Sequence, residues 1–175
     1  PYRGVRGLAG EIGHLVVDPN GYWCGCGQRG CLEAIATPAA LERVARDLSI
    51  ASVPPSWPAI VAAARSGDRT ALNMLTYAAE RLGQAMAAAV NLFGVDFIVV
   101  GGCLPAASPQ VLAVLRQMVQ RGSVTGMAPT VQHTTLDEDA AAQGAATLAL
   151  DTLFAADDHP LTSATWKGGR AAAAG

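Results

Sequence analysis

The sequence predicts an α/β fold, and three features predict it. Residues 68–91 carry apolar side chains at intervals of three or four, which is the period of a helix with one buried side. Residues 97–100 form a continuous apolar run that ends in two glycines, which is typical of a strand buried on both faces of a sheet. A second helical pattern follows at residues 108–121, so helices and strands alternate along the chain.

The first third of the chain is predicted to be loop, turn and short helix. Residues 1–13 contain four glycines and indicate a loop, and residues 14–17 indicate a short strand. Asp-Pro-Asn-Gly at residues 18–21 has strong turn chemistry. A helix is expected to begin near Cys31, and a second one occupies residues 38–48.

Capping residues mark the starts of the longer helices. Thr37 precedes a proline at the first helical position, and Asp68 precedes the long helix that reaches about Asn91. A proline-rich connection at residues 49–58 and a short helix at residues 59–65 lie between them. The expected buried stripe of the long helix contains Leu72, Leu75, Ala79, Leu82, Met86 and Val90.

The last third of the chain continues the α/β pattern. The helix at residues 108–121 is expected to direct Val111, Leu112, Leu115, Met118 and Val119 inward. A strand follows at residues 130–134, and a closing helix at residues 139–154 would pack through its alanines and Gly144. Small, polar and repetitive residues at 156–175 predict a disordered tail.

Composition limits the classes of function. With 175 residues, 51% of them hydrophobic and 15% charged, the chain can bury the core of one globular domain. The formal net charge is -2 and no basic block occurs, so no nucleic-acid surface is expected here. No apolar stretch approaches the roughly 18 residues that span a bilayer. Because the sequence opens on Pro1, we expect it to be part of a longer protein.

A histidine and three cysteines predict a metal site. His14, Cys24, Cys26 and Cys31 have the spacing H-x9-C-x-C-x4-C, with glycines between the cysteines, whereas Cys103 lies far away. Four such ligands suit tetrahedral zinc and leave no open position for a reactive water, so the zinc is expected to be structural. The clustering favours metal in a reducing cytoplasm over a secreted disulfide framework. The alternative is a group of free buried thiols beside a core histidine.

Two motifs around this cluster resemble those of a known family. Ala-Gly-Glu-Ile-Gly-His at residues 9–14 and Cys-Gly-Cys-Gly-Gln-Arg-Gly-Cys-Leu-Glu at residues 24–33 resemble the E-x-G-H and C-x-C-G-x-x-G-C-x-E motifs of the ROK family of repressors and sugar kinases. Residues 90–102 and 139–146 are similar to its C-terminal segments. The resemblance covers about residues 2–154 and implies the C-terminal lobe of the actin-like ATPase (ribonuclease-H-like) fold, with a zinc-binding loop.

The resemblance also implies roles for individual residues. Glu11, His14 and Glu33 match the family residues that hydrogen-bond a sugar or amino sugar; the alternatives are a turn carboxylate for Glu11 and a solvent-facing helix residue for Glu33. Gly101 and Gly102 resemble the glycines that border adenosine in family kinases. A tight exit from a strand explains these two glycines equally well.

We therefore expect the sugar-sensing part of a ROK transcriptional regulator. Residues 1–36 would form the sugar-binding and zinc-binding loop region, and residues 37–155 would form the rest of the same lobe. After Glu33 the chain continues Ala-Ile-Ala-Thr-Pro, similar to family repressors, and residues 137–151 also look repressor-like. DNA would be bound only through a domain absent from this chain, and self-association into a homo-oligomer is expected, with no membrane partner.

Two alternatives remain. One is the C-terminal half of an ATP-dependent sugar kinase, inactive alone because the D-x-G-G phosphate loop and the N-D-x-N motif that carries the catalytic aspartate are not found in these residues. The other is a zinc-stapled interaction module that binds no small ligand.

Overall fold

The computed structural model describes residues 4–50, 52–127, 129–136 and 139–154, and it confirms an α/β chain. Its contacts divide the chain into two units, residues 1–135 and 136–175. The first unit contains two 3-10 turns, η1 (Val5–Gly7) and η2 (Ile12–His14), and then α1 (Glu33–Ala36), α2 (Pro38–Asp47), α3 (Trp57–Arg65), α4 (Arg69–Phe93), β1 (Phe97–Val100), α5 (Cys103–Ala107), α6 (Pro109–Gly122) and β2 (Thr130–His133). The second unit contains α7 (Ala140–Phe154).

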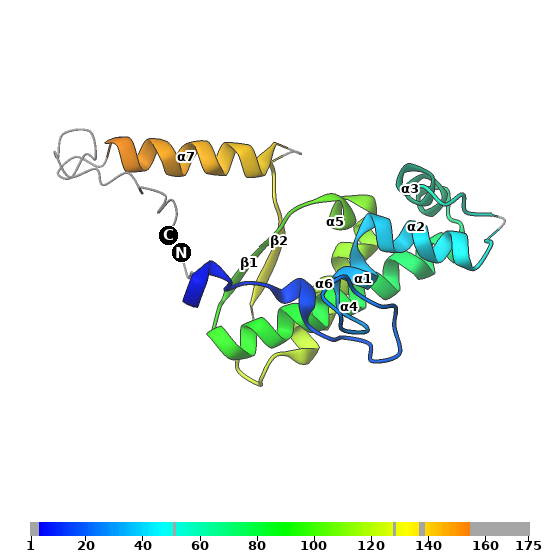
Figure 1. Cartoon of the computed structure of the whole chain (residues 1–175), viewed down its shortest axis with the longest axis horizontal. Coiled ribbons are helices and arrows are strands. Elements are labelled where there is room, and N and C mark those ends of the chain that lie inside the picture. The colour runs from blue at the N-terminus through cyan, green and yellow to red at the C-terminus, as the bar shows by residue number, and fades with distance from the viewer. Residues whose placement is uncertain (1–3, 51, 128, 137–138, 155–175) are drawn as a thin grey trace, which may run out of the picture. The chain divides into compact units, whose positions relative to one another are not determined.

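The long helix α4 and the helix α6 lie side by side and organise the first unit (Figure 1). The carboxylate of Asp68 caps α4 by accepting from the Ala71 backbone N–H at 2.8 Å, as predicted. Gly94 ends α4 in the left-handed conformation, with φ of 65°. The two helices approach closely where Gly83 faces Met118, since a Cβ on Gly83 would lie 2.5 Å from the Met118 Cβ.

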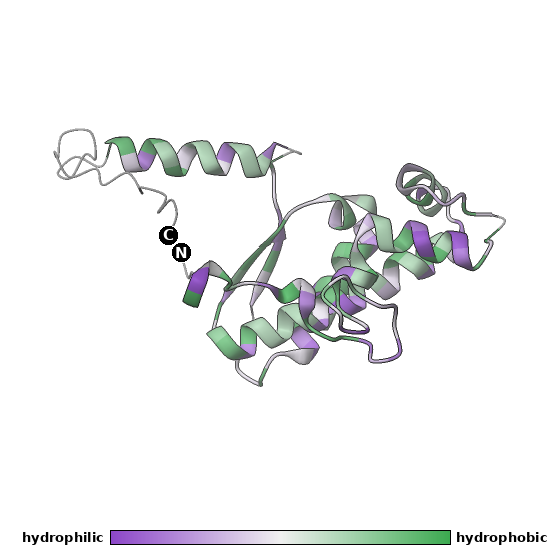
Figure 2. Ribbon diagram, viewed as in Figure 1, coloured by the Kyte–Doolittle hydropathy of each residue, from purple (hydrophilic) through white to green (hydrophobic). Residues whose placement is uncertain are grey.

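The predicted buried stripe of α4 forms much of the main core. Leu75, Ala79, Met86 and Val90 are buried there, while Leu72 and Leu82 are half-buried. Figure 2 shows apolar residues along α4, α6 and β1. From α6, the core receives Val111, Leu115 and Val119, as its period predicts, whereas the predicted Leu112 and Met118 are only half-buried.

The two strands form a parallel pair in which Phe97 is opposite Thr130 and Val100 is opposite His133. Parallel neighbours need a crossover connection, which α5 and α6 supply. The prediction that residues 97–100 are buried on both faces is wrong. Ile98 and Val100 lie in or against the core, whereas Phe97 and Val99, on the other face, are 51% and 57% exposed.

Two further sequence predictions need correction. Residues 14–17 do not form a strand, because the segment makes only an isolated bridge between Val16 and Cys31. Helix α3 begins at Trp57, two residues before the predicted start. The short helix α5 follows Gly102 and was not predicted; it contains a proline and no helical period is visible over so few residues.

The helix α7, described by itself, confirms the predicted closing helix. None of its residues is buried, so the predicted packing face of alanines and Gly144 is not seen. The predicted tail at residues 156–175 lies outside the described residues. Within the residues that the structure describes, no helix is both long enough and apolar enough to cross a membrane.

Candidate metal and sugar site

The candidate site begins in the loop that joins η2 to α1. Its two arms are held together by backbone bonds: the Gly30 N–H donates to the Tyr22 carbonyl at 2.8 Å, and the Val17 N–H donates to the Gly30 carbonyl at 2.9 Å. Gly30 has φ of 75°, and a Cβ there would lie 1.5 Å from the carbonyl oxygen of Asp18. Only glycine fits this position without moving the backbone.

This folding gathers the four predicted metal ligands. The ligand atoms of His14, Cys24, Cys26 and Cys31 all lie within 4.8 Å of one another. His14 Nδ1 lies 3.7 Å from Cys24 Sγ, and Cys26 Sγ lies 3.6 Å from Cys31 Sγ. A tetrahedron with zinc–sulfur bonds of about 2.3 Å has edges of roughly 3.7 Å, so the donor set fits a tetrahedral zinc ion.

Burial differs among the three thiols. Cys24 and Cys31 are buried with Ala34 in a small second core, against which Tyr22 packs, whereas Cys26 is exposed. Burial raises the pKa of Cys31 to about 12, and a hydrogen bond from the Gln28 backbone holds the pKa of Cys26 below its ordinary value. A neutral thiol must lose its proton before it can bind zinc, so binding of a zinc ion by these thiols would release protons.

The two nitrogens of His14 face different partners. Nδ1 faces the cysteine cluster, while Nε2 lies 3.9 Å from Glu11 Oε2 and 4.0 Å from Glu33 Oε2. The loop brings Glu11 to this point and the first turn of α1 brings Glu33. The structure therefore brings the three predicted sugar-binding residues together. Their separation is too long for direct hydrogen bonds, and a ligand hydroxyl beside them could bond a carboxylate and the imidazole together.

The predicted nucleotide-binding glycines lie elsewhere in the first unit. Gly101 directly follows β1, and Gly102 precedes α5 with φ of 87°, a conformation that favours glycine. A Cβ on Gly101 would make an ordinary contact, 3.5 Å from the Thr134 side chain. The backbone conformation explains the glycine at 102 without a nucleotide, so both interpretations of the pair stay open.

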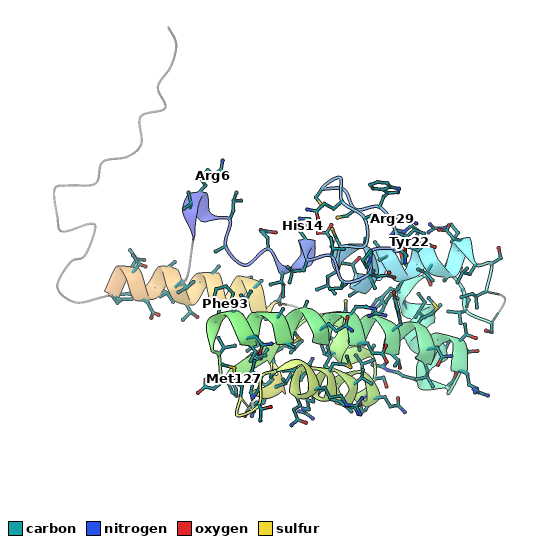
Figure 3. The ribbon with its side chains drawn as sticks, turned by 90° about the horizontal axis from the view of Figure 1, so that it is seen from below. Arg6, His14, Tyr22, Arg29, Phe93 and Met127 are labelled. Carbon is teal, nitrogen blue, oxygen red and sulfur yellow. The ribbon has the colours of Figure 1, made fainter. Side chains whose placement is uncertain are left out.

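Sequence reasoning missed the contact between the loop and α4. The Tyr77 hydroxyl donates to Asp18 Oδ2 at 2.5 Å, across a separation of 59 residues. Arg29, which carries a charge opposite to that of the thiolates, donates from Nε and Nη2 to the carbonyls of Gly21 and Asn20. Figure 3 shows His14, Tyr22 and Arg29 on the same side of α4, while Met127 lies on the opposite side, next to the end of α6. The sequence offered one sign of this contact: Tyr77 is an aromatic residue on the polar side of the helical pattern.

The chain is similar to known proteins in sequence and in fold. The sequence pattern of the ROK family matches residues 1–152. The chain is 33% identical over 159 residues to a glucokinase of Thermotoga maritima, covering 83% of this chain and 50% of the glucokinase. It is 35% identical over 125 residues to the N-acetylglucosamine repressor of Escherichia coli, covering 67% of this chain and 31% of the repressor.

A solved structure agrees in fold. The ROK hexokinase of Thermus thermophilus matches with a TM-score of 0.74 at 33% identity, covering 86% of this chain and 51% of the hexokinase. The chain thus spans about half the length, or less, of the relatives it matches. Both kinases and a repressor are among them.

Proposed function

This chain belongs to the ROK family, and on that premise we propose that it is the sugar-sensing part of a ROK transcriptional regulator with a structural zinc ion. The observation that carries the sugar-binding proposal is the position of the Glu11 and Glu33 carboxylates, 3.9 and 4.0 Å from Nε2 of His14. Carboxylates accept hydrogen bonds from neighbouring hydroxyls, and the imidazole can bond a third. This combination suits a sugar or amino sugar.

A bound zinc ion would cross-link the loop, and its ligands would be His14, Cys24, Cys26 and Cys31. Coordination through Nδ1 fixes the tautomer and the ring orientation of His14, so Nε2 is directed at the carboxylates. In this proposal residues 1–36 form the sugar-binding and zinc-binding loop, and residues 37–155 form the rest of an actin-like lobe. The zinc holds the sensing loop in place and takes no part in a reaction.

The choice of a regulator rests on sequence. The segment after Glu33, Ala-Ile-Ala-Thr-Pro, is similar to family repressors, and the match to the E. coli repressor supports the choice. Sugar binding would change the affinity for DNA by linkage, through a difference in sugar affinity between two conformations. With a net charge of -2 and no basic block, these residues would leave DNA binding to another part of the regulator.

The match to the T. maritima glucokinase favours a second candidate, the C-terminal half of a sugar kinase. In that case the adenosine of ATP would lie against Gly101 and Gly102. The two candidates share the sugar site and differ in phosphoryl transfer. The chain alone is expected to transfer no phosphate from ATP to a sugar under either candidate. The full-length protein separates the two candidates: a kinase would phosphorylate glucose, N-acetylglucosamine or N-acetylmannosamine, and a regulator would not.

Calorimetric titration of the zinc-loaded chain with these three sugars tests the shared proposal. Glu33→Gln should weaken binding by about 10-fold or more, because it removes a charged hydrogen-bond acceptor. Glu80→Gln, on α4, is the matched control and should bind like the wild type. Unchanged sugar affinity in the Glu33 variant would show that the carboxylates do not form the site.

A further inference from the structure

A pocket of about 590 Å³ is lined in part by the same loop. The loop residues 18–29, the helices α1 and α2, and the N-terminal half of α4 each contribute to its wall. Neither the three candidate sugar-binding residues nor the four candidate metal ligands line it. Its volume lies within the range of roughly 300–1,000 Å³ that is typical of small-molecule sites.

The floor of the pocket is apolar and comes from three helices. It is lined by Ile35 of α1, Leu41 and Val44 of α2, Leu48 directly after α2, and Met74 of α4. Apolar atoms make up most of the pocket surface, so a sugar or a charged metabolite would lose hydration here without regaining hydrogen bonds. The floor therefore selects an apolar ligand.

Three aromatic side chains, Tyr22, Trp23 and Tyr77, form the walls. The guanidinium of Arg43 lies 4.3 Å from the Tyr22 ring centre, and that of Arg81 lies 4.7 Å from the Tyr77 ring centre. Neither arginine lines the pocket, and their contacts hold the two tyrosine rings in place before a ligand arrives. Trp23 lines the pocket and is nevertheless 70% exposed, which leaves a large aromatic surface for a ligand to cover.

Polar groups are few and lie on the loop and α4. The carboxylate of Asp18 accepts from the Tyr77 hydroxyl and the Asn20 backbone N–H and keeps acceptor capacity for a further donor. Arg29 uses Nε and Nη2 on backbone carbonyls of the loop. The charges of Asp18 and Arg29 offset each other, so the pocket offers no net charge to an ion, and a ligand hydroxyl or N–H suits the free acceptor capacity of Asp18.

We propose that this pocket binds an uncharged aromatic molecule of one or two rings, whose hydroxyl or N–H group donates to Asp18. The rings stack between the tyrosines and under Trp23, and the aliphatic floor covers their edges. The site is separate from the proposed sugar site, so it does not depend on the regulator assignment. The pocket wall and the metal ligands share one loop, with Trp23 directly before Cys24.

Calorimetric titration of the zinc-loaded chain with 2-naphthol tests the proposal, and the anion 2-naphthoate is the comparison ligand. We expect saturable binding of one 2-naphthol per chain, with a Kd on the order of 0.1 mM for a ligand of this size. Binding of 2-naphthoate should be at least about 10-fold weaker, because its carboxylate cannot donate to Asp18 and loses hydration in a pocket with no net positive charge. No saturable 2-naphthol binding, or stronger binding of the anion, would overturn the proposal.

Matched variants locate the site. Val44→Trp fills the pocket from α2 and should weaken 2-naphthol binding at least about 10-fold, whereas Val124→Trp adds the same ring at a side chain that is 59% exposed and does not line the pocket. Trp23→Ala removes an exposed wall and should also weaken binding, which keeps the test decisive if Val44→Trp does not fold. Unchanged binding in Trp23→Ala and in folded Val44→Trp would refute the site. If the chain forms a dimer and 2-naphthol dissociates it, the pocket serves self-association and the proposal is wrong.

Discussion

Replacing Gly30 by alanine should disrupt the loop that carries the candidate metal ligands. The added Cβ would lie 1.5 Å from the carbonyl oxygen and 2.4 Å from the carbonyl carbon of Asp18, and both atoms are backbone. The left-handed φ of 75° alone costs an alanine about 1–2 kcal/mol. Moving the backbone apart also breaks the three hydrogen bonds that Gly30 makes with Val17, Asp18 and Tyr22, each contributing about 1 kcal/mol. The expected loss of unfolding free energy is therefore about 4 kcal/mol.

Gly27→Ala is the matched control in the same loop. Gly27 also has a left-handed φ, 90°, but nothing lies within 4 Å of an added Cβ, so its cost is limited to about 1–2 kcal/mol. Thermal unfolding and elemental analysis for zinc should be measured together on both variants. A difference of about 3 kcal/mol corresponds to a melting temperature lower by roughly 6–12 °C in the Gly30 variant, which should also lose its zinc. Equal melting temperatures and equal zinc contents would refute the steric argument.

Three further predictions concern the helix pair, the metal and the pH. Gly83→Ala should lower the unfolding free energy by about 1–3 kcal/mol, measured by urea denaturation, because its Cβ would lie 2.5 Å from that of Met118. Elemental analysis should find about one zinc per chain, and Cys26→Ser or a chelator should remove it and lower the melting temperature; zinc retained by the variant would contradict the ligand set. The Tyr77 hydroxyl lowers the pKa of Asp18 below its ordinary 3.8, so the associated stability is present above about pH 4 and is lost as the pH falls through the lower folded value. Tyr77→Phe should raise that pKa, seen by NMR titration, and should make the loss of stability in acid less steep.

Local sequence signals predicted the helices well because their causes are local. Thr37 and Asp68 accept from backbone N–H groups three residues ahead, at Ala40 and Ala71, so a cap and the following period are sufficient to locate the helix start. The turn at residues 18–21 is also local, since the Asp18 carbonyl accepts from the Gly21 N–H at 2.8 Å. Such contacts need no knowledge of the rest of the chain.

The strand at residues 97–100 shows where local reasoning fails. A continuous apolar run indicates burial on both faces, but Phe97 and Val99 are more than half exposed. Which face is covered depends on where α4 and α6 lie, and the sequence of the strand holds no information about this. The predicted strand at residues 14–17 failed for a similar reason. A strand needs a partner segment over several residues, and in this segment only Val16 pairs, with Cys31.

The sequence by itself determined the composition of the site, since the spacing of His14, Cys24, Cys26 and Cys31 and the glycines among them specify a donor set suited to zinc. Tertiary structure alone decided the geometry. The two nitrogens of His14 face the thiols and the carboxylates because the loop closes on Gly30, and Asp18 meets Tyr77 only because α4 passes beneath that loop. Ligand identity is a property of residues close in sequence, whereas the direction of a side chain and the walls of a pocket arise from contacts between segments far apart in the chain.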